Sequence, residues 1–119
     1  MANAEPNVAA YELQERCAKS AVQAWTKYYD NGNYSQGNIS YQAHYNSRLN
    51  KCFFLEMRMT VNGKNDVWSG LSLFDLLENK EYGGFTRSTL HGVVECRMQD
   101  VFCDSEDEWR QLAKQFLED

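Results

Sequence analysis

The segment that decides the fold class covers residues 53–63 and reads FFLEMRMTVNG. Every odd-numbered position from Phe53 to Val61 is apolar, whereas Glu56 and Arg58 are charged. An apolar residue at every second position is typical of a β-strand with one covered face. The Asn62-Gly63 pair that follows is a strong signal for a tight turn, so the chain is expected to reverse there and form a second, antiparallel strand.

More strands are predicted on both sides of this segment. Alternation before it predicts a strand over 39–45, joined to the first by a turn near 46–51. After it, the segment from about 66 to 77 is apolar at both parities, which indicates either a central strand covered on both sides or a bulge near Gly70. A further strand is expected over 82–87, weakened by Gly83-Gly84, and a hairpin over 93–103.

A helix is predicted at each end of these strands. Apolar residues recur at helical spacing between Val8 and Tyr29, and Cys17 lies on the apolar stripe. Asp30-Asn31-Gly32 is expected to end this helix, because glycine suits a left-handed cap. Near the other terminus, Ser105 and Glu108 form a capping box ahead of a short amphipathic stretch.

The order of these elements predicts an α+β fold. We expect a long N-terminal helix packed on a curved antiparallel sheet of four to six strands, followed by a short C-terminal helix, because short turns between consecutive strands do not permit parallel pairing. The chain has 119 residues, an ordinary size for one domain. Residues 8–119 are therefore expected to form a single α+β domain, with 1–7 as a disordered N-terminal segment.

Charge and hydropathy exclude some partners. Twelve basic and seventeen acidic side chains give a net charge of -5, which disfavours nucleic acid or an anionic membrane as the main partner. No apolar run approaches the roughly 20 residues that a membrane-spanning helix needs. The sequence leaves the oligomeric state open.

Four cysteines bear on the compartment. An even number in a small chain suits two disulfides, for which three connectivities exist, and four free thiols in a cytosolic interaction protein are the alternative. A two-residue loop at Gln99-Asp100 would place Cys96 opposite Cys103. In that register the two residues form a hydrogen-bonded pair, whose Cα spacing of about 5.5 Å is less usual for a disulfide, although a longer loop would relieve this. We still pair Cys96 with Cys103 and Cys17 with Cys52, the other connectivities remaining open.

The first residues also favour export. Ala2-Asn3-Ala4 has small residues two apart, like the tail of a signal peptidase site. On this interpretation a leader has been removed, and the protein is periplasmic or extracellular. An ordinary N-terminus is the alternative interpretation.

Two stretches resemble a known group of proteins. Residues 44–53 read HYNSRLNKCF, and residues 73–83 contain Leu73-Phe74-Asp75 followed by ENKEYG. Both resemble segments of small exported bacterial proteins of unknown function, and the later Cys96 and Cys103 pair fits the same pattern. The resemblance covers roughly residues 13 to 118. It implies an exported location and a cysteine framework, and it supplies no catalytic residue.

The segment 41–51 is the best candidate for ligand binding. Its basic residues can receive an anionic group and its tyrosines offer flat contact area. The alternative is structural, because asparagines build turns by bonding to the backbone while tyrosines pack. The ligand-binding candidates are Tyr41, His44, Tyr45, Arg48 and Lys51.

These observations favour a non-enzymatic module that binds a protein, a cell-wall fragment or a small ligand through the concave face of the sheet. The alternative is a small enzyme that uses His44 with a nearby cysteine or carboxylate, since His44 and Cys52 flank one turn. We assign no catalytic residue, no metal ligand and no cofactor, because the histidines and cysteines lack paired-ligand spacing. Trp68, Phe85 and Phe54 are a candidate patch for a protein partner.

Overall fold

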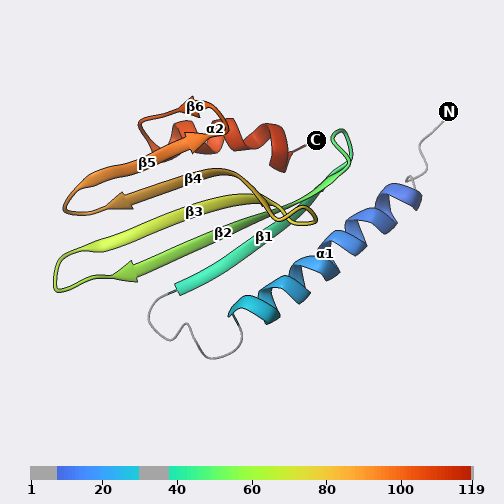
Figure 1. Cartoon of the computed structure of the whole chain (residues 1–119), viewed down its shortest axis with the longest axis horizontal. Coiled ribbons are helices and arrows are strands. Elements are labelled where there is room, and N and C mark those ends of the chain that lie inside the picture. Colours follow the sequence, from blue (N-terminus) through green and yellow to red (C-terminus); the bar gives the residue numbers. More distant parts are fainter. Residues whose placement is uncertain (1–7, 30–37, 119) are drawn as a thin grey trace.

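The computed structural model describes residues 8–29 and 38–118 and contains one antiparallel sheet between two helices (Figure 1). The strands follow one another in the sheet in chain order, so each pairs with its sequence neighbour. This confirms the α+β class and all of the predicted elements. Their bounds are α1 Val8–Tyr29, β1 Asn38–Asn46, β2 Lys51–Val61, β3 Val67–Asp75, β4 Lys80–Ser88, β5 Gly92–Met98, β6 Val101–Phe102 and α2 Glu106–Leu117.

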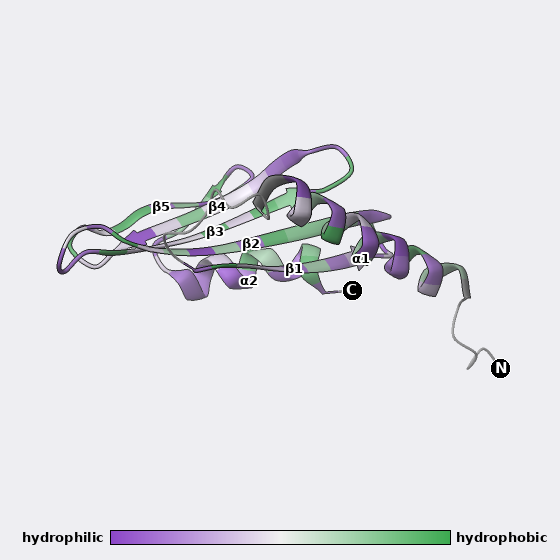
Figure 2. Cartoon of the chain, turned by 90° about the horizontal axis from the view of Figure 1, so that it is seen from below, coloured by the Kyte–Doolittle hydropathy of each residue, from purple (hydrophilic) through white to green (hydrophobic). Residues whose placement is uncertain are grey.

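The two helices lie on opposite faces of the sheet (Figure 2). Successive residues of a strand point to opposite faces, so the register of β2 separates two sets of side chains. The even-numbered residues from Cys52 to Arg58 lie on the face that carries α1, because Cys52 is bonded to Cys17 of that helix. Phe53 and Leu55 lie on the face that carries α2. We call these the α1 face and the α2 face.

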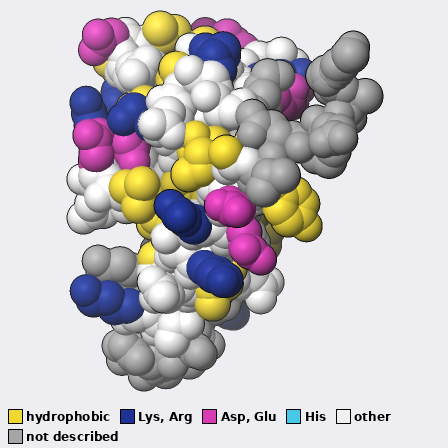
Figure 3. Space-filling model, turned by 90° about the vertical axis from the view of Figure 1, so that its right-hand side faces the viewer, with side chains coloured by type: hydrophobic (Ala, Val, Ile, Leu, Met, Phe, Trp, Pro, Cys, Tyr) yellow, Lys and Arg dark blue, Asp and Glu magenta, His cyan; other side chains and the backbone are white. Residues whose placement is uncertain are grey.

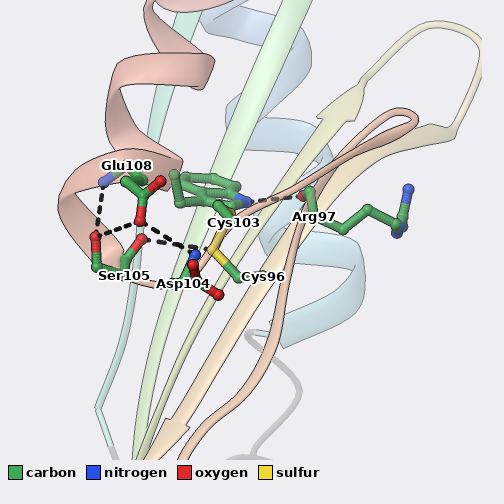
Figure 4. Close-up of a disulfide and its surroundings, with 7 residues drawn as sticks. Cys96, Arg97, Cys103, Asp104, Ser105 and Glu108 are labelled. Carbon is green, nitrogen blue, oxygen red and sulfur yellow. Dashed lines mark hydrogen bonds between the residues drawn. A yellow bond between two sulfur atoms is a disulfide. The ribbon is translucent and has the colours of Figure 1, made fainter.

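The larger hydrophobic core fills the α2 face. Trp109 of α2 is fully buried, and its indole N–H donates to the Arg97 carbonyl of β5 at 3.0 Å. The predicted capping box starts this helix, since the Ser105 hydroxyl accepts from the Glu108 amide at 3.1 Å (Figure 4). The buried members of this core are Phe53, Leu55, Leu71, Leu73, Phe85, Cys96, Met98, Trp109, Ala113 and Phe116.

The α1 face is covered over only part of its width. Helix α1 packs mainly against β1, and its small buried cluster consists of Cys17, Tyr45 and Cys52. The expected curvature is absent: the sheet stays open and flat, and does not curl around the helix (Figure 2). Helix α1 contacts β1 and β2, so β3, β4 and β5 have no helix on this face around which the sheet could curve. Part of the α1 face over these strands is therefore left without a covering helix.

Both predicted disulfides are confirmed. Cys17 bonds to Cys52 and Cys96 bonds to Cys103, with Cα–Cα distances of 5.4 and 5.0 Å. All four cysteines lie in the described residues, so none is free and the alternative of four free thiols is wrong for this structure. One bond ties α1 to the sheet, and the other ties β5 to the segment that leads into α2 (Figure 4).

Some local details differ from the predictions. Strand β3 ends at Asp75, earlier than the expected 77, and its register against β4 shifts between Leu73 and Phe74, not at Gly70. Gly83 does not interrupt β4, which runs from Lys80 to Ser88. A Cβ at this position would lie 2.6 Å from the Arg97 carbonyl oxygen, so the close packing of β4 against β5 requires a glycine here. The predictions for residues 1–7 and for the cap at 30–32 lie outside the described residues.

Candidate functional site

The predicted tyrosines pack on the α1 face. Tyr41 lies between two aromatic rings, with centroid distances of 4.9 Å to Trp25 and 5.0 Å to Phe54. Tyr45 is 8% exposed, and its hydroxyl donates to the Asn50 side-chain oxygen in the adjoining turn. These contacts hold α1 and the first hairpin together and use most of the surface that the two rings have to offer.

The two basic candidates already have partners within the protein. The Arg48 guanidinium donates to the Gln115 carbonyl of α2 at 2.6 Å. The Lys51 ammonium lies 3.0 Å from Asp75 and 3.3 Å from Glu78. Hydrogen bonding to Asp75 raises the pKa of Lys51. Burial alone would raise the pKa of Asp75, but the contacts with Lys51 and the hydrogen bonds from Glu78 together outweigh it and the pKa is lowered.

His44 lies apart from the other candidates. It pairs with Phe53 across β1 and β2 and thus belongs to the α2 face, whereas Cys52 lies on the α1 face with its sulfur in a disulfide. The proposed pairing of His44 with a Cys52 thiolate is therefore wrong. The prediction that Trp68, Phe85 and Phe54 form one aromatic patch is wrong as well. Phe85 is buried in the α2-face core, whereas Trp68 and Phe54 lie on the α1 face.

A different set of side chains converges where the α1 face lacks a helix. In the register, Gly70 of β3 pairs with Thr86 of β4, and Ser72 pairs with Gly84. These four neighbours include two glycines on one diagonal, so side chains from the outer strands can lean over the middle of the sheet. Arg58 comes from β2, and Glu95 comes from β5.

Arg58 is held over Gly70 by a buried carboxylate. Its Nη1 donates to Glu56 at 2.6 Å, and Glu56 is only 3% exposed. A Cβ on Gly70 would lie 2.8 Å from Nη2 and 3.3 Å from Nε of Arg58, so this second edge of the guanidinium lies over the glycine. Burial raises the pKa of Glu56, and the Arg58 charge only partly opposes that effect.

Glu95 reaches over the other glycine. A Cβ on Gly84 would lie 3.0 Å from the Glu95 carboxylate. Within the described residues, the Glu95 carboxylate and the hydroxyls of Ser72 and Thr86 have no hydrogen-bond partner, and Arg58 pairs only with Glu56. We call Arg58, Ser72, Thr86 and Glu95 the central polar patch. It presents a donor edge, a carboxylate and the Thr86 hydroxyl at the surface, with Ser72, which is only 7% exposed, next to them.

Trp68 borders the central polar patch at the end of the sheet where β3 begins. Its indole N–H donates to Asp66 at 2.8 Å, which fixes the ring, and Asp66 also accepts from the Ser88 hydroxyl at 2.6 Å. The hydrogen bond from Ser88 lowers the pKa of Asp66 even though burial opposes this. An open hollow of about 430 Å³ lies here, lined by Arg58, Thr60, Val61, Asn62, Trp68 and Thr86.

The sequence contained part of the signal for this site. Glu56 and Arg58 stand out as charged residues in the apolar run of 53–61, and Gly70 marks a position of close backbone or side-chain approach. The contribution of Glu95 could not be predicted, because it depends on a register shift between Thr86 and Arg87 that sets which β5 residue faces Thr86.

Charges of both signs are mixed at one end of the molecule (Figure 3). On the end of the molecule that carries the first hairpin turn, basic and acidic side chains lie next to one another with hydrophobic groups between them (Figure 3). Neither helix in the described part of the chain is both long and apolar enough to cross a membrane. Within residues 8–29 and 38–118, no three metal-binding side chains gather into a possible metal site.

Comparison with known proteins adds no family. No protein-family model, no curated protein and no solved structure matches this chain. Interpretation of the site therefore depends on its own geometry and chemistry.

Proposed function

We propose that this protein is an exported, non-enzymatic binding module whose ligand lies on the central polar patch. The observation that carries the proposal is the gathering of unpartnered polar groups on a surface that neither helix covers. Protein side chains usually satisfy their own hydrogen bonds or project into solvent separately. Here Arg58 and Glu95 lean toward the same few residues of the sheet.

The site suits binding because it is already organised. Its side chains come from the middle of a hydrogen-bonded sheet, Arg58 is fixed by Glu56, and the neighbouring Trp68 ring is fixed by Asp66. A ligand therefore meets an arginine and an indole that lose little side-chain entropy on association. The adjoining hollow of about 430 Å³ is widely open to solvent, so it offers a shallow surface for one face of a ligand.

Binding is favoured over catalysis by the state of the reactive groups. All four cysteines are in disulfides, so no thiolate is available as a nucleophile. The buried carboxylate Glu56 is engaged with Arg58, and His44 lies on the other face of the sheet. The groups that remain on the patch are suited to hydrogen bonding.

Export is supported by the two disulfides. Disulfides form and persist in oxidising compartments and are rare in the cytosol. The Cys17–Cys52 bond joins residues 35 apart in the chain, and it fixes α1 to the sheet. This anchoring helix would lose its covalent attachment in a reducing compartment.

Two measurements test the proposal. Alkylation of thiols in intact cells of the source organism, before any reduction, should leave all four cysteines unlabelled; labelling of all four would reject export. An NMR screen of a mixed library of sugars, amino acids, short peptides and nucleosides should shift the backbone amides of Gly70, Ser72, Gly84 and Thr86 for at least one compound. Loss of the shifts in Thr86→Arg, with its large side chain in the hollow, is expected, whereas failure of every compound would refute binding.

A further inference from the structure

We infer that the ligand of the central polar patch is a neutral, polyhydroxylated ring, that is, an uncharged sugar unit stacked against Trp68. This inference rests on the proposed function and specifies its ligand class. It is carried by the alternation of donor-only and acceptor-only groups across the patch and by the fixed indole beside them.

The charges of the patch disfavour simple ions. Arg58 pairs with Glu56, Arg97 on the same face pairs with Glu81, and Glu95 reaches over the neighbouring Gly84, so no positive charge is left in excess. The whole chain carries a net charge of -5. An anion that binds to Arg58 approaches Glu95, and a cation that binds to Glu95 approaches Arg58. A neutral ligand avoids both repulsions.

Hydroxyl groups complement every member of the patch. A guanidinium only donates hydrogen bonds, an ionised carboxylate only accepts them, and serine and threonine hydroxyls do both. A ring with hydroxyls on adjacent carbons can accept from the Nη2 and Nε edge of Arg58 and donate to Glu95 at once. Thr86 lies between these two groups in the register and can bond to the same ring, whereas Ser72 lies in the neighbouring row and is 7% exposed.

Trp68 provides the apolar part of the contact. The ring is partly exposed, lines the hollow of about 430 Å³ and is held in place by Asp66. Sugar rings have an apolar face of C–H groups, and a fixed aromatic ring buries such a face at little entropic cost. Arg58 and Glu95 lie over the glycines at 70 and 84, so these two side chains form the polar surface beside the indole ring.

The test is a titration followed by two-dimensional NMR. The neutral probes are cellobiose, maltose and N,N′-diacetylchitobiose, and the contrasting probes are digalacturonate and N-acetyl-trialanine amide. A neutral disaccharide is expected to bind with a dissociation constant of about millimolar or lower and to shift the Trp68 indole signal. The indole signal of buried Trp109 on the other face serves as the internal reference.

Two nearly isosteric variants examine the patch itself. Glu95→Gln and Thr86→Val should each weaken the neutral sugar by about threefold to tenfold, the loss of one hydrogen bond. The control is Arg87→Lys, which changes an exposed residue next to Thr86 on the α2 face. Dispersed amide spectra of all three variants establish that they are folded.

Each outcome decides the inference. Binding of a neutral disaccharide that both patch variants weaken and the control does not supports it. Binding of only digalacturonate or the peptide at the patch overturns the sugar class but leaves the proposed function standing. Equal binding to all variants, or no response to any neutral sugar, overturns the inference, and the library screen then decides separately whether the patch binds any ligand.

Discussion

The two disulfides are expected to contribute unequally to stability, and their difference can be worked from the chain. The Cys17–Cys52 bond spans 35 residues, whereas the Cys96–Cys103 bond spans 7. Closing a loop restricts the unfolded chain by an entropy that grows with the logarithm of loop length. At 25 °C this relation gives about 3.8 kcal/mol for the longer loop and about 2.4 kcal/mol for the shorter one, a difference of about 1.4 kcal/mol.

The assay compares Cys17→Ala/Cys52→Ala with Cys96→Ala/Cys103→Ala by urea denaturation under oxidising conditions. Each double variant removes two sulfur atoms from packed positions, so much of the packing loss is common to both and the difference reports the loops. Circular dichroism follows the transition, and the free energy of unfolding is extrapolated to water. The longer-loop variant should be less stable.

The opposite order would refute this reasoning. If removal of the Cys96–Cys103 bond costs as much as removal of the Cys17–Cys52 bond, loop closure does not govern the contribution. The packing of the Cys96 sulfur beside the start of α2 would then be the larger factor (Figure 4). Melting that is insensitive to a reducing agent would contradict a stabilising role for either bond.

Three other changes test the supporting structure. Asn46→Ala should lower the free energy of unfolding by about 3 kcal/mol, because the fully buried side chain makes three hydrogen bonds that contribute about 1 kcal/mol each. Two of these bonds go to carbonyls of the last turn of α2. A loss of less than about 1 kcal/mol, the contribution of a single bond, would contradict this prediction. Gly83→Ala should cost about 1–3 kcal/mol because the new methyl meets the Arg97 carbonyl, whereas Gly84→Ala, which meets only the flexible end of Glu95, should cost clearly less in the same thermal melts. The pKa of Asp66 is lowered in the folded protein, so its ionised form stabilises the fold at pH values above the ordinary pKa of 3.8, and this stabilisation disappears as the pH falls through the lower folded pKa. In acid titrations, the stability advantage of the wild type over Asp66→Asn should therefore shrink across this range. A constant difference would refute the role of the carboxylate.

Local patterns were sufficient to predict much of the fold. The alternation in 53–61 predicted β2, and the two-residue loop at Gln99-Asp100 predicted the register that brings Cys96 opposite Cys103. The Ser105 capping box predicted the start of α2. Each of these features is decided by residues that are close in the chain, so local propensities and spacing are sufficient to specify them.

Features that depend on distant partners could not be predicted. The sequence suggests that Arg48 and Lys51 are available for a ligand, but Arg48 bonds to a carbonyl 67 positions away and Lys51 pairs with Asp75 of the neighbouring strand, 24 positions away. The flatness of the sheet depends on where α1 lies across it, which no local pattern determines. The patch around Thr86 likewise requires four strands to be in register.

The ion pair between buried Glu56 and partly exposed Arg58 gives a physical reason to separate function from stability. Burial raises the pKa of Glu56, which means that ionising this group costs free energy in the folded protein. Apolar residues of similar size at the positions of Glu56 and Arg58 would continue the hydrophobic run of β2 and avoid this desolvation, and such replacements of buried ion pairs are often neutral or stabilising. Stability alone therefore does not favour the pair. The pair does hold the guanidinium over Gly70 with its second edge free, at the one place on the α1 face where Ser72, Thr86 and Glu95 also lack partners among the described residues.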